Sequence, residues 1–146
     1  MICDIMEFFD KEHIFVVVGA TNNTEKSGYR VFKDLKDSGF NVIGVNKRIG
    51  GKEDIVDTPS YDSLSSFYER ITKFFDEKKK LEAVRKTVVV LVVPPKNAIE
   101  ALHEAIDHGV KKVWFQPGSE SEEAVALCKE NGIAELHGQC IMVKHP

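Results

Sequence analysis

The feature that most constrains this chain is a short apolar run that ends in glycine and leads into a polar loop. Phe15–Val18 is predicted to be a buried strand, and a helix is predicted to begin near Gly28. The first turn of such a helix offers unpaired N–H groups and a partial positive charge, and small residues before it let an anion approach the backbone. The loop therefore predicts a phosphate site. Its candidate residues are Gly19, Ala20, Thr21, Asn22 and Lys26.

The glycine spacing in this loop matches neither common nucleotide-binding pattern. Gly19 and Gly28 lie too far apart for G-x-G-x-x-G, and the loop lacks the Gly-Lys-Ser/Thr ending of a P-loop. Taken alone, the loop also fits an ordinary polar turn after a strand. The phosphate interpretation therefore needs a second signal elsewhere in the chain.

The second signal is a basic segment after the next predicted strand. The predicted strand Asn41–Val45 is followed by Asn46, Lys47 and Arg48. At this place an NAD-binding domain would normally carry an acidic residue for the ribose hydroxyls. A base at this place favours a ribose phosphate. The sequence leaves open whether Lys47 or Arg48 would hold it.

The rest of the chain alternates buried strands with amphipathic helices, which is typical of an α/β domain with a parallel sheet. We expect one domain over residues 1–146, with a doubly wound sheet of about five strands. The predicted strands are Ile14–Val18, Asn41–Val45, Thr87–Val93, Lys112–Phe115 and Ile133–Leu136. The predicted helices are Gly28–Ser38, one capped by Asn97 that ends before Gly109, and one that begins with a capping box of Ser119 and Glu122 and ends at Gly132.

Residues 63–86 form a stretch that a minimal version of this pattern does not need. Its apolar residues follow helical spacing, which predicts one amphipathic helix that runs on through the lysines at 78–80 to Leu81 and Val84. The apolar residues are Leu64, Phe67, Tyr68, Ile71, Phe74 and Phe75. A crossover helix packed on the sheet accounts for this elaboration. The surplus of aromatic side chains also fits a homodimer surface or a surface for a partner subunit.

In an open parallel sheet, ligands lie at the carboxyl ends of the strands, where the strand order reverses. This rule adds candidates at the ends of the later strands to those of the loop and the basic segment. They are Val93, Pro94, Pro95, Gln116, Pro117 and Gly118. The prolines lack N–H donors and would form an apolar wall, although a stiff strand-to-helix turn explains them as well.

Composition excludes several classes of protein. The formal net charge of −3 gives no overall basic field, which argues against a nucleic-acid binder. The three cysteines are odd in number and scattered, so we expect no disulfide framework and no metal site, and a cytoplasmic location. No apolar run is long enough for a membrane span, and the first residues are acidic where a signal peptide would be basic.

The joint set of motifs resembles a known family. VVGATNNTEKSGYRV, FNVIGVNKR, TPSYDSL, VVPP and KVWFQPG are similar to segments of the small stand-alone CoA-binding proteins, which in turn resemble the CoA-binding domain of the succinyl-CoA synthetase α subunit. The resemblance covers about Ile14 to Val143. It implies a Rossmann-like fold that binds coenzyme A or an acyl-CoA.

The resemblance also implies where the parts of the ligand would lie. It puts the diphosphate near Gly19–Thr21 and Lys26, the ribose phosphate near residues 46–48, and adenine or pantetheine beside residues 93–95. It further implies that Tyr29 and Arg30 face the loop from the start of the helix. The chain departs from the family at Lys47, where proline is common, and its 146 residues are not expected to include a domain for the phosphorylated histidine of the synthetases. Ligase activity is therefore not expected.

No catalytic constellation stands out in the sequence. His103 and His108 are spaced so that a helix would not align them on one face, and they are expected at the surface. Cys140 follows the last predicted strand, where it is either a structural thiol or one that could form a mixed disulfide with CoA.

The sequence therefore favours a non-catalytic CoA-binding module, carrier or sensor. One alternative is an NADP-dependent oxidoreductase, because a base after the second strand also suits a 2′-phosphate. The other is a nucleotide-sensing regulatory domain, although no helix-turn-helix segment precedes the sheet.

Overall fold

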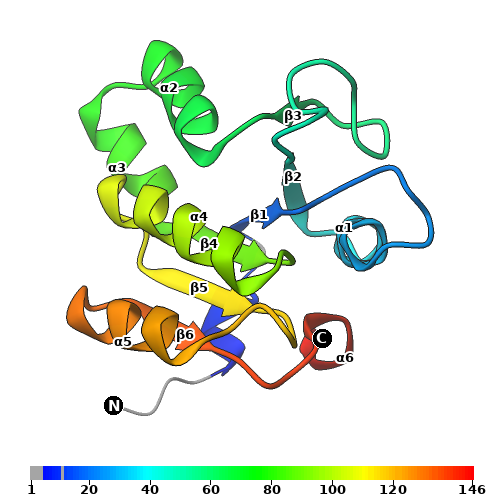
Figure 1. The fold of residues 1–146 in the computed structure, drawn as a ribbon. Helices are drawn as coiled ribbons and strands as arrows, with labels where there is room; N and C mark the ends of the chain where they lie inside the picture. Colours follow the sequence, from blue (N-terminus) through cyan, green and yellow to red (C-terminus); the bar gives the residue numbers. More distant parts are fainter. Residues whose placement is uncertain (1–4, 11) are drawn as a thin grey trace.

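A six-stranded parallel sheet organises the chain (Figure 1). The computed structural model describes residues 5–10 and 12–146. Within them, the strands are β1 (Ile14–Val18), β2 (Asn41–Val45), β3 (Ser60–Tyr61), β4 (Thr87–Leu91), β5 (Lys112–Phe115) and β6 (Ala134–Leu136). Their order is β3-β2-β1-β4-β5-β6, and each neighbouring pair is parallel. This is the order of a doubly wound Rossmann-like sheet, so the predicted single-domain α/β fold is confirmed.

The five strands expected from the sequence are all present, and β3 is additional. Two residues at the edge of a sheet carry no readable alternation, which is why β3 was not predicted. β4 ends at Leu91, two residues earlier than expected, and β6 begins at Ala134. The order reverses between β1 and β4, so the switch point of the sheet lies at the carboxyl ends of these two central strands.

Helices cover both faces of the sheet (Figure 1). The 3-10 helix η1 (Ile5–Phe8), α1 (Ser27–Asp37) and α6 (Ile141–Lys144) contribute side chains to the core on one face. The other face packs against α2 (Leu64–Phe74), α3 (Glu77–Arg85), α4 (Pro95–Asp107) and α5 (Glu122–Glu130). Along β4, Val88 and Val90 join the first core and Val89 joins the second. Burial on both faces explains the unbroken apolar runs of the central strands.

The elaboration at residues 63–86 is two helices, so the prediction of one continuous helix was wrong. Phe75 adopts an extended backbone conformation, and the Asp76 side chain accepts a hydrogen bond from the Lys79 N–H group, which begins α3. Phe74 and Phe75 are 67% and 42% exposed, whereas the apolar residues earlier in α2 are buried. The helical stripe therefore ends where Asp76 offers a new cap.

Two predicted helix starts also need correction. Asn97 does not cap α4, because that helix already begins at Pro95 after Pro94. Ser119 does not cap α5; the cap is Ser121, whose hydroxyl accepts from the Ala124 N–H group at 3.1 Å. In the described part of the chain, no helix has the length and apolar character needed to cross a membrane.

Candidate functional site

The predicted phosphate loop closes through two glycines that touch. Gly19 follows β1 with a φ of +101°, and an added Cβ there would lie 2.4 Å from the Val92 carbonyl oxygen. An added Cβ on Gly28 would lie only 1.9 Å from the Gly19 carbonyl oxygen. Glycine at both places therefore lets α1 start directly against the end of β1. This contact explains why the two glycines matter although their spacing fits no standard pattern.

The Asn46 side chain ties the end of β2 to this loop. Its amide Nδ2 donates to the Ala20 carbonyl oxygen at 2.9 Å, and its Oδ1 accepts from the Arg48 N–H group at 2.8 Å. The same oxygen accepts from the Ile49 N–H group at 3.2 Å. These bonds fix the turn that carries Lys47 and Arg48, so Asn46 positions the basic residues by its hydrogen bonds.

Two of the helices that begin beside the site, α1 and α4, lack a side-chain cap. Ser63, Asp76 and Ser121 cap α2, α3 and α5 through their side chains. The cap residues of α1 and α4, Lys26 and Pro94, make no such bond. Uncapped first turns leave backbone N–H groups for another acceptor, and their partial positive charge favours an anion.

Val93 and Pro94 form a wall that is fixed by a buried serine. The Ser119 hydroxyl donates to the Val93 carbonyl oxygen at 2.6 Å and accepts from the Val93 N–H group at 3.2 Å. Ser119 is only 3% exposed. This pair of bonds, which replaces the predicted capping role, holds the segment after β4 against the loop after β5.

Three cavities meet at this wall, and all three are lined by Val93 and Pro94. The apolar cavity has about 290 Å³ and is lined by residues 18–19, 45–48, 62–64, 93–94, 97, 100–101 and 104. The loop cavity has about 660 Å³ and is lined by residues 19, 21, 23, 25–28, 30, 46, 48–49 and 92–94. The C-terminal cavity has about 590 Å³ and is lined by residues 27, 30, 92–95, 116–119, 140 and 142. Together they follow the carboxyl end of the sheet across the switch point.

Most of the residues predicted for the site line these cavities. Those that do are Gly19, Thr21, Lys26, Arg30, Asn46, Lys47, Arg48, Val93, Pro94, Pro95, Gln116, Pro117 and Gly118. Ala20, Asn22 and Tyr29 are not among the lining residues. Asn22 instead hydrogen-bonds the Asp54 carbonyl oxygen and the Val56 N–H group.

The basic side chains of the site differ in how they are engaged. Lys47 forms an ion pair with Glu100 of α4, with 2.6 Å between Nζ and Oε2. Arg30 donates to the Glu25 carbonyl oxygen at 3.1 Å and to the Ser27 hydroxyl at 3.3 Å. Among the described residues, none contacts the Arg48 guanidinium or the Lys26 ammonium by a hydrogen bond or ion pair. Arg48 and Lys26 are therefore the free cations of the loop cavity.

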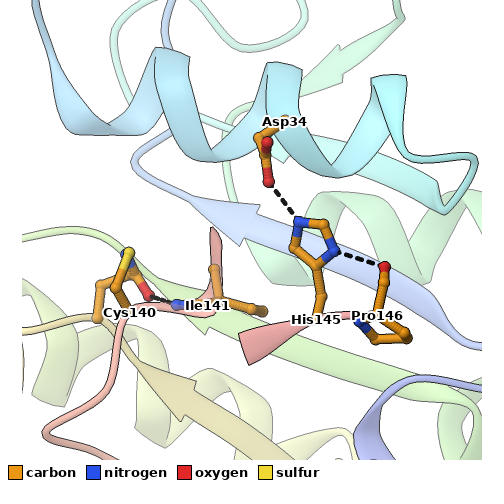
Figure 2. A network of polar contacts seen from close by, with 6 residues as sticks. Asp34, Cys140, Ile141, His145 and Pro146 are labelled. Atoms are coloured by element: carbon orange, nitrogen blue, oxygen red, sulfur yellow. Dashed lines mark hydrogen bonds and ion pairs between the residues drawn. The ribbon is translucent and has the colours of Figure 1, made fainter. Parts of the chain in front are cut away.

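The C-terminal residues complete one side of the site. The Gln116 side chain is buried, donates to the Cys140 sulfur at 3.4 Å and accepts from the Ile141 N–H group at 2.7 Å. Figure 2 shows Cys140 and Ile141, and farther along the chain His145, whose ring lies beside the Asp34 carboxylate of α1. Cys140 lines the C-terminal cavity, whereas burial raises the pKa of the Cys128 thiol to about 12. Cys3 lies outside the described residues.

The two histidines expected at the surface behave differently. His103 is exposed, whereas His108 is half-buried, stacks on the Tyr68 ring and has its Nε2 3.3 Å from the Ser65 hydroxyl. In the part of the chain that the structure describes, no group of three His, Cys, Asp or Glu residues could hold a metal ion.

Sequence reasoning missed several cavity residues. Asp62, Ser63, Glu100 and Glu104 line the apolar cavity, and Met142 lines the C-terminal cavity. The first two follow β3, so an identified third strand would have found them by the strand-end rule. Glu100 and Glu104 lie on one face of α4, and no local signal shows which face of a helix borders a cavity.

Comparison with known proteins places this architecture in a family. Residues 13–146 match the family described as CoA binding domain. The chain is 28% identical over 148 residues to the α subunit of an ADP-forming acetate–CoA ligase II of Pyrococcus furiosus. That match covers 94% of this chain but only 28% of the ligase subunit. An uncharacterised Bacillus subtilis protein, YneT, is 22% identical, with 97% of this chain and 92% of YneT covered.

Solved structures agree with the sequence comparison. A conserved hypothetical protein from Pyrococcus furiosus is 33% identical and superposes with a TM-score of 0.72, covering 90% of this chain and 98% of that one. A hypothetical protein from Pyrococcus horikoshii is 28% identical with a TM-score of 0.69, covering 88% and 78% of the two chains.

Proposed function

The chain belongs to the family of CoA-binding domains, and from this membership we propose that it binds coenzyme A or an acyl-CoA across the carboxyl ends of its strands. We further propose that it acts as a binding module, carrier or sensor without catalysis of its own. The ligase named among the relatives is more than three times as long as the matched segment, so its activity is not transferred to this chain.

The observation that carries the proposal is the row of cavities that meet at Val93 and Pro94. CoA is a long ligand with a charged adenosine half and a thin pantetheine arm. The apolar cavity would take the adenine, and the loop cavity, with Lys26 and Arg48, would take the phosphates. The arm would pass along Pro94 and Pro95 into the C-terminal cavity.

The hydrogen bonds of the potential nucleophiles support a non-catalytic role. The Ser119 hydroxyl is engaged by the backbone of Val93, and the Cys140 sulfur accepts from the Gln116 amide. A hydroxyl or thiol nucleophile is commonly activated by a base within hydrogen-bond reach. Within the described chain, these two groups contact a backbone group and an amide, and neither is a base.

The first experiment compares CoA with dephospho-CoA by titration calorimetry. Wild-type protein should bind CoA more tightly, and the double variant Lys47→Ala/Arg48→Ala should lose most of that difference. Charge-assisted hydrogen bonds of about 1.5–3 kcal/mol correspond to an affinity ratio of about ten- to hundredfold. The preference should also shrink as the salt concentration rises.

A matched control removes the same charge elsewhere. Lys78→Ala/Lys79→Ala changes two exposed lysines of α3, which line none of the three cavities, and should keep the preference for CoA. Equal affinity of the wild-type protein for CoA and dephospho-CoA would refute the assignment of a ribose-phosphate site.

Thermal unfolding separates CoA from the dinucleotides. A ligand that binds only the folded state raises the melting temperature by mass action. We expect a clear rise with CoA and little with NAD. A larger rise with NADP than with CoA would favour the oxidoreductase alternative.

The position of Cys140 in the C-terminal cavity supports a covalent test of where the arm ends. In the presence of CoA disulfide, the Cys140 thiolate should attack one sulfur, form a mixed disulfide and release one CoA thiolate. Intact-mass and peptide analysis should find one CoA at Cys140 and none at the buried Cys128. Modification at Cys3 or Cys128 instead would contradict this placement.

A further inference from the structure

Lys47 and Glu100 join two different walls of the apolar cavity. Lys47 follows β2 and Glu100 belongs to α4, and both line this cavity. Their ion pair, with 2.6 Å between Nζ and Oε2, links positions 53 residues apart in the sequence. The two side chains are 60% and 56% exposed, so the pair lies at the solvent side of the cavity. The pair therefore links the β2 side of the cavity to α4 at a solvent-exposed position.

The neighbouring base, Arg48, differs from Lys47 in the contacts of its side chain. It lines both the apolar cavity and the loop cavity, and within the described residues its guanidinium makes no hydrogen bond or ion pair. Its backbone N–H group is held by Asn46, which fixes the turn and leaves the side chain free. Two adjacent bases thus differ in whether a carboxylate already neutralises them.

We propose that Lys47 and Glu100 form a clasp over the apolar cavity that slows the release of an adenosine ligand, whereas Arg48 supplies the charge that recognises the ribose phosphate. The proposal rests on the proposed binding of CoA. The sequence alone leaves open which of the two bases holds the ribose phosphate; the proposal assigns that role to Arg48 and a different one to Lys47.

The charges around the pair favour this division. A phosphate that approached Lys47 would have to displace Glu100, whose carboxylate repels it, and two further carboxylates, Asp62 and Glu104, line the same cavity. Arg48 has no such competitor among its contacts. The sequence also has lysine where the family commonly has proline, and proline could form no ion pair with Glu100.

The strength of an exposed ion pair suits a clasp that must open. Such pairs contribute little in water, so the side chains can part to admit a ligand. Once a purine fills the cavity beneath them, water is excluded from one side and the attraction between the charges grows. The clasp should therefore slow dissociation more than association.

The experiment measures dissociation rates of CoA and dephospho-CoA by stopped-flow competition. Lys47→Gln and Glu100→Gln should each speed the release of both ligands by about two- to fivefold, which is the range for an exposed pair. The ratio of the two affinities should stay as in the wild type. The double variant should release the ligands no faster than either single variant, because both break the same contact.

Two further variants complete the design. Arg48→Gln should lower the preference for CoA by about ten- to hundredfold. Lys33→Gln removes an exposed lysine that pairs with Asp37 on α1, away from the cavities, and should leave both dissociation rates unchanged.

The outcomes distinguish the clasp from the function on which it rests. If the wild-type protein does not bind CoA, the proposed function is wrong. If it binds CoA but Lys47→Gln abolishes the preference over dephospho-CoA, Lys47 is the phosphate ligand and the division of roles fails. If both clasp variants release ligand at the wild-type rate, or Glu100→Gln tightens CoA alone, the clasp is refuted.

Discussion

The carboxyl end of the sheet and the corner between α2 and α3 both lie beside the apolar core, but they are held in different ways. At the carboxyl end, side chains such as Asn46 and Ser119 bond to the backbone of a neighbouring loop. The corner between α2 and α3 instead leaves Phe74 and Phe75 exposed. The carboxyl end is thus held by long-range hydrogen bonds, whereas the corner is held by the Asp76 helix cap.

The largest difference in stability is expected between variants of two phenylalanines of α2. Phe67→Ala should lower the free energy of unfolding by about 3–5 kcal/mol, because it empties space in the core. Phe74→Ala should lower it by no more than about 1 kcal/mol, since its ring is exposed and contacts the Arg70 guanidinium. Urea unfolding measures both. Equal losses would mean that the corner is covered in solution.

A smaller effect is expected where the two glycines touch. Gly28→Ala should cost about 1–3 kcal/mol, because the new methyl group collides with the Gly19 carbonyl oxygen. It should also weaken CoA binding, since the shift occurs in the loop cavity. Gly51→Ala is the control: nothing lies within 4 Å of the added carbon, so only the strain of its positive φ is added, and CoA affinity should not change. Gly28→Ala with wild-type stability would show that the loop is not closely packed.

The smallest effect tests the corner itself. Asp76→Ala removes the side-chain cap of α3 and should cost about 1 kcal/mol in thermal or urea unfolding. Glu69→Ala, at an exposed position of α2, should change stability by less than about 0.5 kcal/mol. If the two variants were equally stable, the Asp76 side chain would not determine where the second helix begins.

The same two regions show what could be predicted from the sequence. Strands buried on both faces, such as β1 and β4, can be recognised in the sequence as apolar runs. The strand-end rule for parallel sheets then predicts where the ends of these strands lie. The loop, the basic segment and the prolines were therefore found as one site. Their roles in binding remain predictions.

What the sequence did not reveal depends on contacts between distant residues. Helical spacing continues through Phe74 and Phe75, although the structure leaves both side chains exposed. Ser119 has the right spacing for a cap, but its hydroxyl is bonded to Val93, 26 residues earlier. Lys47 and Glu100 meet only because β2 and α4 border the same cavity.

The wall at residues 93–95 has a consequence for the direction of any bound ligand. The Val93 N–H group already donates a hydrogen bond to the Ser119 hydroxyl, and Pro94 and Pro95 have no backbone N–H group. Three consecutive residues therefore have no free backbone donor. Lys26 and Arg48 line the loop cavity and not the C-terminal cavity, whereas the first turn of α1 borders both. A chain of ligand atoms crossing this stretch would lose hydrogen bonds to water if it carried charge there. A long ligand bound as proposed would therefore keep its anionic half on the side of Lys26 and Arg48.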